Sequence, residues 1–158
     1  MLSQLDRLKF EVDGRYATDA ELQFLVDYVQ SFHLRSQTYI KLQELEAILV
    51  QQAYEKIRSD NPALFNYKNA DIGAKWKQDT LRVLRYTAVA VLMNDPDTFK
   101  ERFLLWFQTI MKAFGAQQTC DVTYQVLQTL VKQHFSLPQS QLICPILELT
   151  RQTLGAKS

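Results

Sequence analysis

The chain has 158 residues, the size of one domain, and 47% of them are hydrophobic, which is enough for a buried core. Its 18 Lys and Arg nearly balance its 17 Asp and Glu and lie scattered, whereas nucleic-acid-binding proteins concentrate positive charge on one face. Four glycines and four prolines are too few for a β-sandwich or barrel with many tight turns. No apolar run approaches the roughly twenty residues that span a bilayer, and the N-terminus lacks the apolar region of a signal peptide. We therefore expect a single cytosolic domain over residues 1–158, with no nucleic-acid partner.

The N-terminal part of the chain predicts two helices joined by a turn. Residues 2–13 repeat apolar side chains at helical spacing and end in an Asp-Gly turn signal. Thr18 and Glu21 form a capping box, which predicts the start of a helix that reaches Arg58 with a bend near residues 43–47. Because an isolated helix of about a dozen residues is marginally stable, segment 2–13 must pack on its own domain or on a partner. The pattern leaves both open.

Helical periodicity continues to the end of the chain, without strand alternation. A loop is expected over residues 61–74, after an Asp-Asn-Pro break. Residues 75–95 contain no Gly or Pro and repeat apolar residues every three or four positions, on a face that widens toward the C-terminal end. This segment is therefore predicted to be the central helix of the core. Further helices are expected over residues 96–115, 121–135 and 139–154.

The sequence is poor in catalytic chemistry. It contains no glycine-rich phosphate loop, no CxxC and no HExxH motif, so no metal site is predicted, and Cys120 and Cys144 are expected to be buried thiols. Asp79 lies beside Trp76 on the first turn of the central helix. It is either an aspartate favoured by the helix dipole or an acceptor for the N–H groups of a ligand. No evident acid–base pair or activated nucleophile is present, so an enzyme is not expected.

Three stretches match the motifs of one known family in order and in spacing. The turn GRY at residues 14–16, followed by Glu21, matches GRYL…EL, and residues 48–53 (ILVQQA) together with Arg35 match the next helix. Residues 76–101 match CxRDxxYYLRxxxYxxxAGDxxxxxE without a gap, at Asp79, Leu84, Arg85, Asp95 and Glu101. On these motifs the chain resembles the phycobiliproteins, the subunits of the phycobilisome antenna.

The resemblance covers nearly the whole chain and implies its architecture. The expected fold is all-α, with a globin-like, phycocyanin-like core over residues 33–158 and an N-terminal helical hairpin over residues 1–32 for dimerisation. In the family, the Arg of the YLR motif pairs with an acidic residue on the hairpin of the partner subunit. The corresponding residues here are Arg85 and Glu11, and the interface is expected to include Arg15 and Tyr16 of the hairpin turn.

The departures from the family pattern concern its chromophore. The family attaches an open-chain tetrapyrrole through a thioether to the cysteine that opens the central motif, and Trp76 stands at that position. Gln78 replaces an arginine that contacts a chromophore propionate, whereas Lys75 and Asp79 match positions that contact a propionate and the pyrrole nitrogens. The loop 61–74 lacks the family's Pro-Gly-Gly-Asn run. No covalent chromophore is therefore expected, and attachment is not transferred to either cysteine.

Two functions follow from the resemblance. The first is a non-enzymatic phycobiliprotein-like subunit that dimerises with itself or with a phycobiliprotein. It would act in assembly, regulation or turnover of the phycobilisome or photosystems, at the cytosolic face of the thylakoid membrane, and its other expected partners are a photosystem or an assembly intermediate. The alternative is a protein that binds a bilin or chlorophyll-type tetrapyrrole noncovalently through Lys75, Trp76 and Asp79. An enzyme acting on bilins is a weaker third possibility.

Overall fold

The computed structural model describes residues 1–155, and helices dominate it. The α-helices are α1 (Leu2–Glu11), α2 (Asp19–Asp60), α3 (Gly73–Met93), α4 (Pro96–Phe99), α5 (Leu105–Ala113), α6 (Gln117–His134) and α7 (Leu137–Leu154). A single π-helical segment, η2 (Lys100–Leu104), joins α4 to α5. The predicted all-α, globin-like fold is confirmed. Each of the expected helices is present, although α6 and α7 begin a few residues earlier than predicted.

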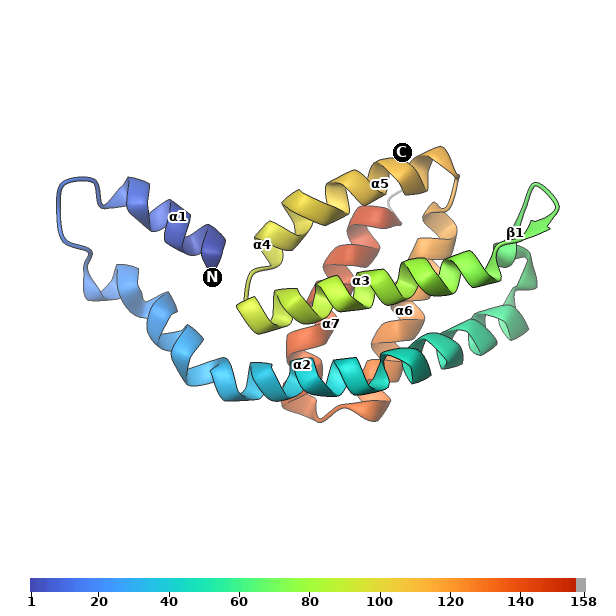
Figure 1. The fold of residues 1–158 in the computed structure, drawn as a ribbon, viewed down its shortest axis with the longest axis horizontal. Helices are drawn as coiled ribbons and strands as arrows, with labels where there is room; N and C mark the ends of the chain where they lie inside the picture. The colour runs from blue at the N-terminus through green and yellow to red at the C-terminus, as the bar shows by residue number, and fades with distance from the viewer. Residues whose placement is uncertain (156–158) are drawn as a thin grey trace.

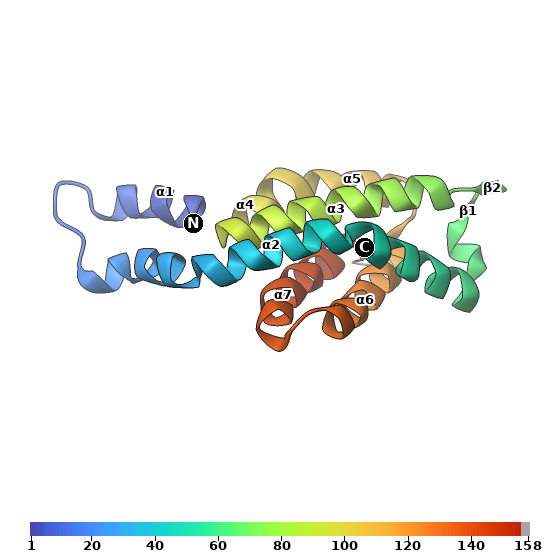
Figure 2. The same ribbon diagram turned by 60° about the horizontal axis from the view of Figure 1, so that its bottom comes forward.

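The core lies between two groups of helices. Helices α2 and α3 run side by side, with α4 and α5 along the other side of α3, and the pair α6–α7 crosses them from below (Figures 1 and 2). Helix α3 contacts both groups, and its buried residues become denser toward its end because four of the five residues 87–91 are buried. The widening apolar face of this segment thus places it in the centre of the core, as predicted.

Helix α1 and the first part of α2 form a hairpin that projects from the core (Figures 1 and 2). The predicted capping box starts α2: the Glu21 N–H donates to Thr18 Oγ1 at 3.3 Å, and the Thr18 N–H donates to Glu21 Oε2 at 2.8 Å. Gly14 adopts a left-handed φ of +72° in the connecting turn, a conformation that glycine tolerates without strain. Helix α1 contains no fully buried residue: Leu5 and Leu8 are partly covered and Phe10 is exposed, so the hairpin covers its own apolar side chains incompletely.

A buried aspartate ties α1 to the core. Asp95 caps α4 by accepting a hydrogen bond from the Thr98 N–H at 3.1 Å. It also accepts hydrogen bonds from the Ser3 N–H at 2.9 Å and from the Ser3 hydroxyl at 2.7 Å. Burial alone would raise the pKa of this carboxyl, but the hydrogen bonds from Ser3 and Thr98 outweigh burial and hold it well below its usual range. An ionised aspartate therefore fixes the start of the hairpin against α4.

Helix α2 is one continuous helix of 42 residues, which confirms the predicted long helix, and the bend predicted near residues 43–47 does not interrupt its helical hydrogen bonding. It curves along its length, and its first part turns away from the core (Figure 1). Where it leaves the core, the fully buried Arg35 side chain donates to the backbone carbonyls of Tyr28 and Leu92, and its guanidinium lies 3.9 Å from the centroid of the Tyr28 ring. Leu92 belongs to the last turn of α3, where the helix dipole is negative. The buried cation thus holds α2 against the end of α3, and no carboxylate of residues 1–155 pairs with it.

The segment predicted as a plain loop is more ordered than expected. It contains the 3₁₀ helix η1 (Pro62–Phe65) and two short antiparallel strands, β1 (Asn66–Tyr67) and β2 (Ala70–Asp71). The two residues between the strands both have positive φ, which is typical of a tight two-residue hairpin turn. The expectation that no strand would form was wrong here, because two residues are too few to produce a visible alternation.

Candidate functional site

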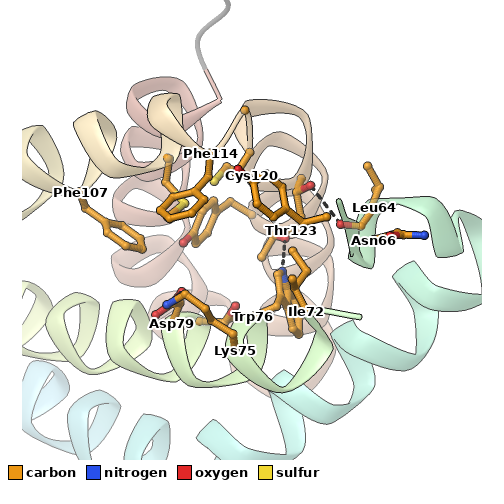
Figure 3. Close-up of a pocket in the computed structure, with 17 residues that line it drawn as sticks. Leu64, Asn66, Ile72, Lys75, Trp76, Asp79, Phe107, Phe114, Cys120 and Thr123 are labelled. Carbon is orange, nitrogen blue, oxygen red and sulfur yellow. Dashed lines mark hydrogen bonds and ion pairs between the residues drawn. The ribbon is translucent and has the colours of Figure 1, made fainter. Parts of the chain in front are cut away.

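Trp76 lies on the first turn of α3 and points into the core (Figure 3). Its side chain is only 8% exposed, and its Nε1–H donates a 2.9 Å hydrogen bond to Thr123 Oγ1 on α6. The Phe65 ring meets the indole edge-on at a centroid distance of 5.3 Å, and the Tyr54 ring lies 6.0 Å away. The indole, which projects from α3, is therefore held by contacts from three other segments, those that contain Tyr54, Phe65 and Thr123.

A cavity of about 230 Å³ opens beside this indole (Figure 3). It lies between the first turns of α3, the β1 strand, the end of α5 and the start of α6. The Tyr67 and Phe114 rings meet edge-on at 5.6 Å and close one side. The apolar walls come mainly from Leu64, Ile72, Trp76, Phe107, Met111 and Phe114.

Lys75 and Asp79 also line this cavity. They are one helical turn apart, and Lys75 Nζ lies 3.1 Å from Asp79 Oδ2. The Lys75 side chain is largely exposed and that of Asp79 mostly buried, so the pair lies at the mouth with the carboxylate inward. The structure therefore brings the three predicted site residues to one cavity, although two of them already bond each other. Their role in ligand binding stays a prediction.

Helix α6 supplies polar groups to the cavity that the sequence analysis did not single out: Thr119, Cys120, Thr123 and Tyr124. Their spacing of three to four residues on one helical face was the available signal. Burial and the nearby Asp79 carboxylate raise the pKa of Cys120 to about 12, and burial also raises the pKa of Tyr124. Both groups are therefore protonated at neutral pH, so neither is an activated nucleophile.

The sequence matches the phycobilisome protein family over residues 8–154. The chain belongs to this family. Phycobilisome proteins are light-harvesting structural proteins that associate with other phycobiliprotein subunits and bind bilins, usually covalently. No curated protein matches the chain. Within residues 1–155, no helix is both long and apolar enough to cross a membrane.

Three features of the site count against the covalent bilin that phycobilisome proteins usually carry. At the attachment position the Trp76 indole has no sulfur, so no thioether can form there. Cys120 lies in the same cavity, but its raised pKa leaves almost no thiolate to form a thioether. The cavity of about 230 Å³ is also smaller than the sites of about 300–1,000 Å³ that hold drug-sized ligands.

Arg85, the predicted interface arginine, is bonded within its own chain. It makes a bidentate ion pair with Glu46 of α2, with Nε 2.9 Å from Oε2 and Nη2 2.6 Å from Oε1. This pair borders a groove of about 260 Å³ between α2 and α3 that Tyr39, Leu42, Gln43, Ala88 and Val89 also line. The pairing of Arg85 with Glu11 of a second chain stays a prediction, and it would add a carboxylate to the Arg85–Glu46 pair.

The other predicted interface residues lie in or beside the hairpin turn. Arg15 forms an ion pair with Glu21 at 2.6 Å and also donates to the Glu11 backbone carbonyl at 3.1 Å, which fixes the shape of the turn. The Arg15 hydrogen bond and those from Thr18 lower the pKa of Glu21 to about 2. Tyr16, at 97% exposure, packs on nothing in its own chain. The turn is thus held by several hydrogen bonds and presents an aromatic ring to solvent.

Proposed function

We propose that this phycobilisome protein is a subunit without covalent bilin that acts through protein–protein association and not as an enzyme. The buried Trp76 supports the loss of the covalent pigment, because its indole replaces the thiol and is part of the core. The protonated Cys120 and Tyr124 and the mutually bonded Lys75 and Asp79 support a non-enzymatic role, since none of them is an activated nucleophile or free base.

The observation that carries the proposal is the uncovered apolar surface of the hairpin. Helix α1 buries no residue, and Phe10 and Val29 are 84% and 71% exposed. Further exposed apolar side chains lie at Leu2, Tyr16, Val26 and Phe32 of the hairpin and at Tyr86 and Val89 of α3. Exposed apolar side chains gathered in this way are typical of protein interfaces.

The proposed partner is a second copy of the chain or a phycobiliprotein subunit. One chain carries both the apolar hairpin and the groove beside Arg85, so two copies related by a two-fold axis can each place a hairpin on the other. We further propose a role in assembly, regulation or turnover of the phycobilisome or photosystems at the cytosolic face of the thylakoid membrane. The location of phycobilisome proteins on the cytoplasmic side supports this last point.

Analytical ultracentrifugation of the purified chain, alone and mixed with phycobiliprotein subunits, tests the association. Arg85→Glu places a carboxylate beside Glu46 and is expected to shift the dimer toward monomer, because like charges then meet at the groove. Arg82→Glu, an equal charge reversal at an exposed position one turn earlier on α3, is the matched control and should leave the dimer intact. A chain that is monomeric alone and in every mixture contradicts the proposal.

The alternative is a noncovalently bound tetrapyrrole. The Lys75–Asp79 pair at the mouth and the flat wall of the Trp76 indole support this candidate, whereas the small volume of the cavity counts against it. Titration with biliverdin and with a chlorophyll derivative, followed by absorption spectroscopy, tests it. A red shift that saturates at one ligand per chain is expected, and an unchanged spectrum excludes this candidate.

A further inference from the structure

We propose that the cavity beside Trp76 binds a neutral, planar compound of one or two rings that makes a hydrogen bond to the Tyr124 hydroxyl. This inference competes with the tetrapyrrole alternative for the same cavity and does not depend on the proposed dimer. It assigns a different class of ligand to a site that the family uses for a pigment of four rings.

The size of the cavity limits the ligand. An apolar cavity of about 150 Å³ is enough for benzene, whereas drug-sized ligands occupy about 300–1,000 Å³. The cavity here, at about 230 Å³, falls between these limits. The rings of Trp76, Phe107 and Phe114 form part of its walls and offer flat faces against which an aromatic ring can pack. One or two rings are therefore the expected content.

The charges of the site limit the ligand further. Lys75 and Asp79 form an ion pair at the mouth, so their charges cancel. Cys120 and Tyr124 are both protonated, since burial raises the pKa of each. A carboxylate or an ammonium group entering the cavity would lose its hydration without gaining an unpaired opposite charge. The ligand is therefore neutral.

Tyr124 supplies the polar anchor. Its side chain lines the cavity and is only 3% exposed, no hydrogen bond joins its hydroxyl to any group of residues 1–155, and its oxygen is not among the fully enclosed atoms without a partner, so it is accessible from the cavity. The neighbouring hydroxyls are engaged: Thr119 donates to the Leu64 carbonyl at 3.4 Å, and Thr123 accepts from the Trp76 indole. A phenolic hydroxyl in an apolar site usually finds a partner, and a ligand with one N–H or O–H group can provide it.

Ligand-observed saturation-transfer NMR on the full chain tests the proposal, with phenol and indole as one-ring and two-ring probes. Both are expected to receive saturation from the protein, with dissociation constants in the micromolar to millimolar range because they are fragments. The chain has two tryptophans, so Trp106→Phe leaves Trp76 as the sole tryptophan, whose emission can be excited selectively over that of the tyrosines. The Trp76 emission is expected to change when phenol binds, which locates the probe at this cavity.

Tyr124→Phe removes the hydroxyl and keeps the ring, so the fold is retained. It is expected to raise the dissociation constants of both probes by about fivefold or more, which corresponds to the loss of one buried hydrogen bond. Tyr86→Phe, at a half-exposed tyrosine outside the cavity, is the matched control and should bind as the wild type does. Ala116→Phe fills the cavity from the start of α6 and is expected to abolish binding of both probes.

Three results would overturn the proposal. In the first, neither probe binds the wild-type chain. In the second, both probes bind equally well after Tyr124→Phe and Ala116→Phe, which means that they bind outside this cavity. In the third result, biliverdin binds more tightly than indole and its binding is lost in the same two variants, which assigns the cavity to a tetrapyrrole. Each of these results leaves the ultracentrifugation test of the dimer untouched, so the two proposals fail separately.

Discussion

Helices α2, α3, α6 and α7 of the core each bury several side chains against one another, whereas α1 of the hairpin buries none. In the core, even the large Trp76 is covered and hydrogen-bonded. In the hairpin, Phe10 and Val29 face solvent although they are as apolar as many core residues. The core thus buries its hydrophobic side chains within one chain, whereas the hairpin leaves an apolar surface that a partner can cover.

Two buried polar contacts hold these contrasting regions together. Arg35 locks α2 to the end of α3 where the hairpin leaves the core, and Asp95 holds the start of α1 through Ser3. Both contacts are directional, so they fix how the hairpin projects without covering it. A preformed hairpin loses less conformational entropy when a partner binds, which favours association.

The largest expected effect lies in the core. Trp76→Ala removes the indole, its hydrogen bond to Thr123 and its contact with Phe65, and should lower the free energy of unfolding by about 3–5 kcal/mol. Chemical denaturation measures this loss. Trp106→Ala, at a 54% exposed tryptophan, is the control and should lower the free energy of unfolding much less. Equal losses in the two variants would mean that Trp76 does not belong to the core as described.

The next effect concerns the hairpin and should leave the core unchanged. Val29→Asp places a charge on the apolar surface, and because burying a valine contributes about 1.5–3 kcal/mol, the dimer should weaken by about tenfold to a hundredfold. Analytical ultracentrifugation measures the dissociation constant, and denaturation of the dilute monomer should match the wild type. Gln30→Asp adds the same charge at the neighbouring exposed position and is the control. If both variants dimerise normally, the hairpin is not the interface.

The smallest effect lies at the contact between the two regions. Ser3→Ala removes one hydrogen bond to the ionised Asp95 and should lower the free energy of unfolding by about 1–2 kcal/mol at neutral pH. Ser3→Thr keeps the hydroxyl and should retain most of the wild-type free energy of unfolding. Thermal unfolding of both variants measures the difference.

The loss of unfolding free energy caused by Ser3→Ala should also depend on pH. The native pKa of Asp95 lies below its unfolded value, so the unfolded chain takes up the proton first as the pH falls. The contribution of Asp95 is therefore present above the unfolded aspartate pKa of about 3.9 and is lost as the pH falls below it toward the native pKa. A Ser3→Ala penalty that grows on acidification would contradict this assignment.

The sequence by itself determined the helices and the family. Helical periodicity, the Thr18–Glu21 capping box and the proline breaks act over a few neighbouring residues, so they are readable without the fold. The absence of a sulfur atom at Trp76 is likewise a property of one residue, and it rules out a thioether there whatever the structure.

Only the tertiary structure decided what surrounds these residues. Thr123, which holds the Trp76 indole, lies 47 positions away, and Leu92, which accepts from Arg35, lies 57 positions away. The volume of the cavity and the position of the Tyr124 hydroxyl beside it depend on how α3, α5 and α6 pack, and the exposure of the hairpin depends on how little of α1 the core covers. Periodicity assigns a residue to a face of a helix, but only the packing of distant segments decides which faces meet, which remain open and which polar groups find a partner.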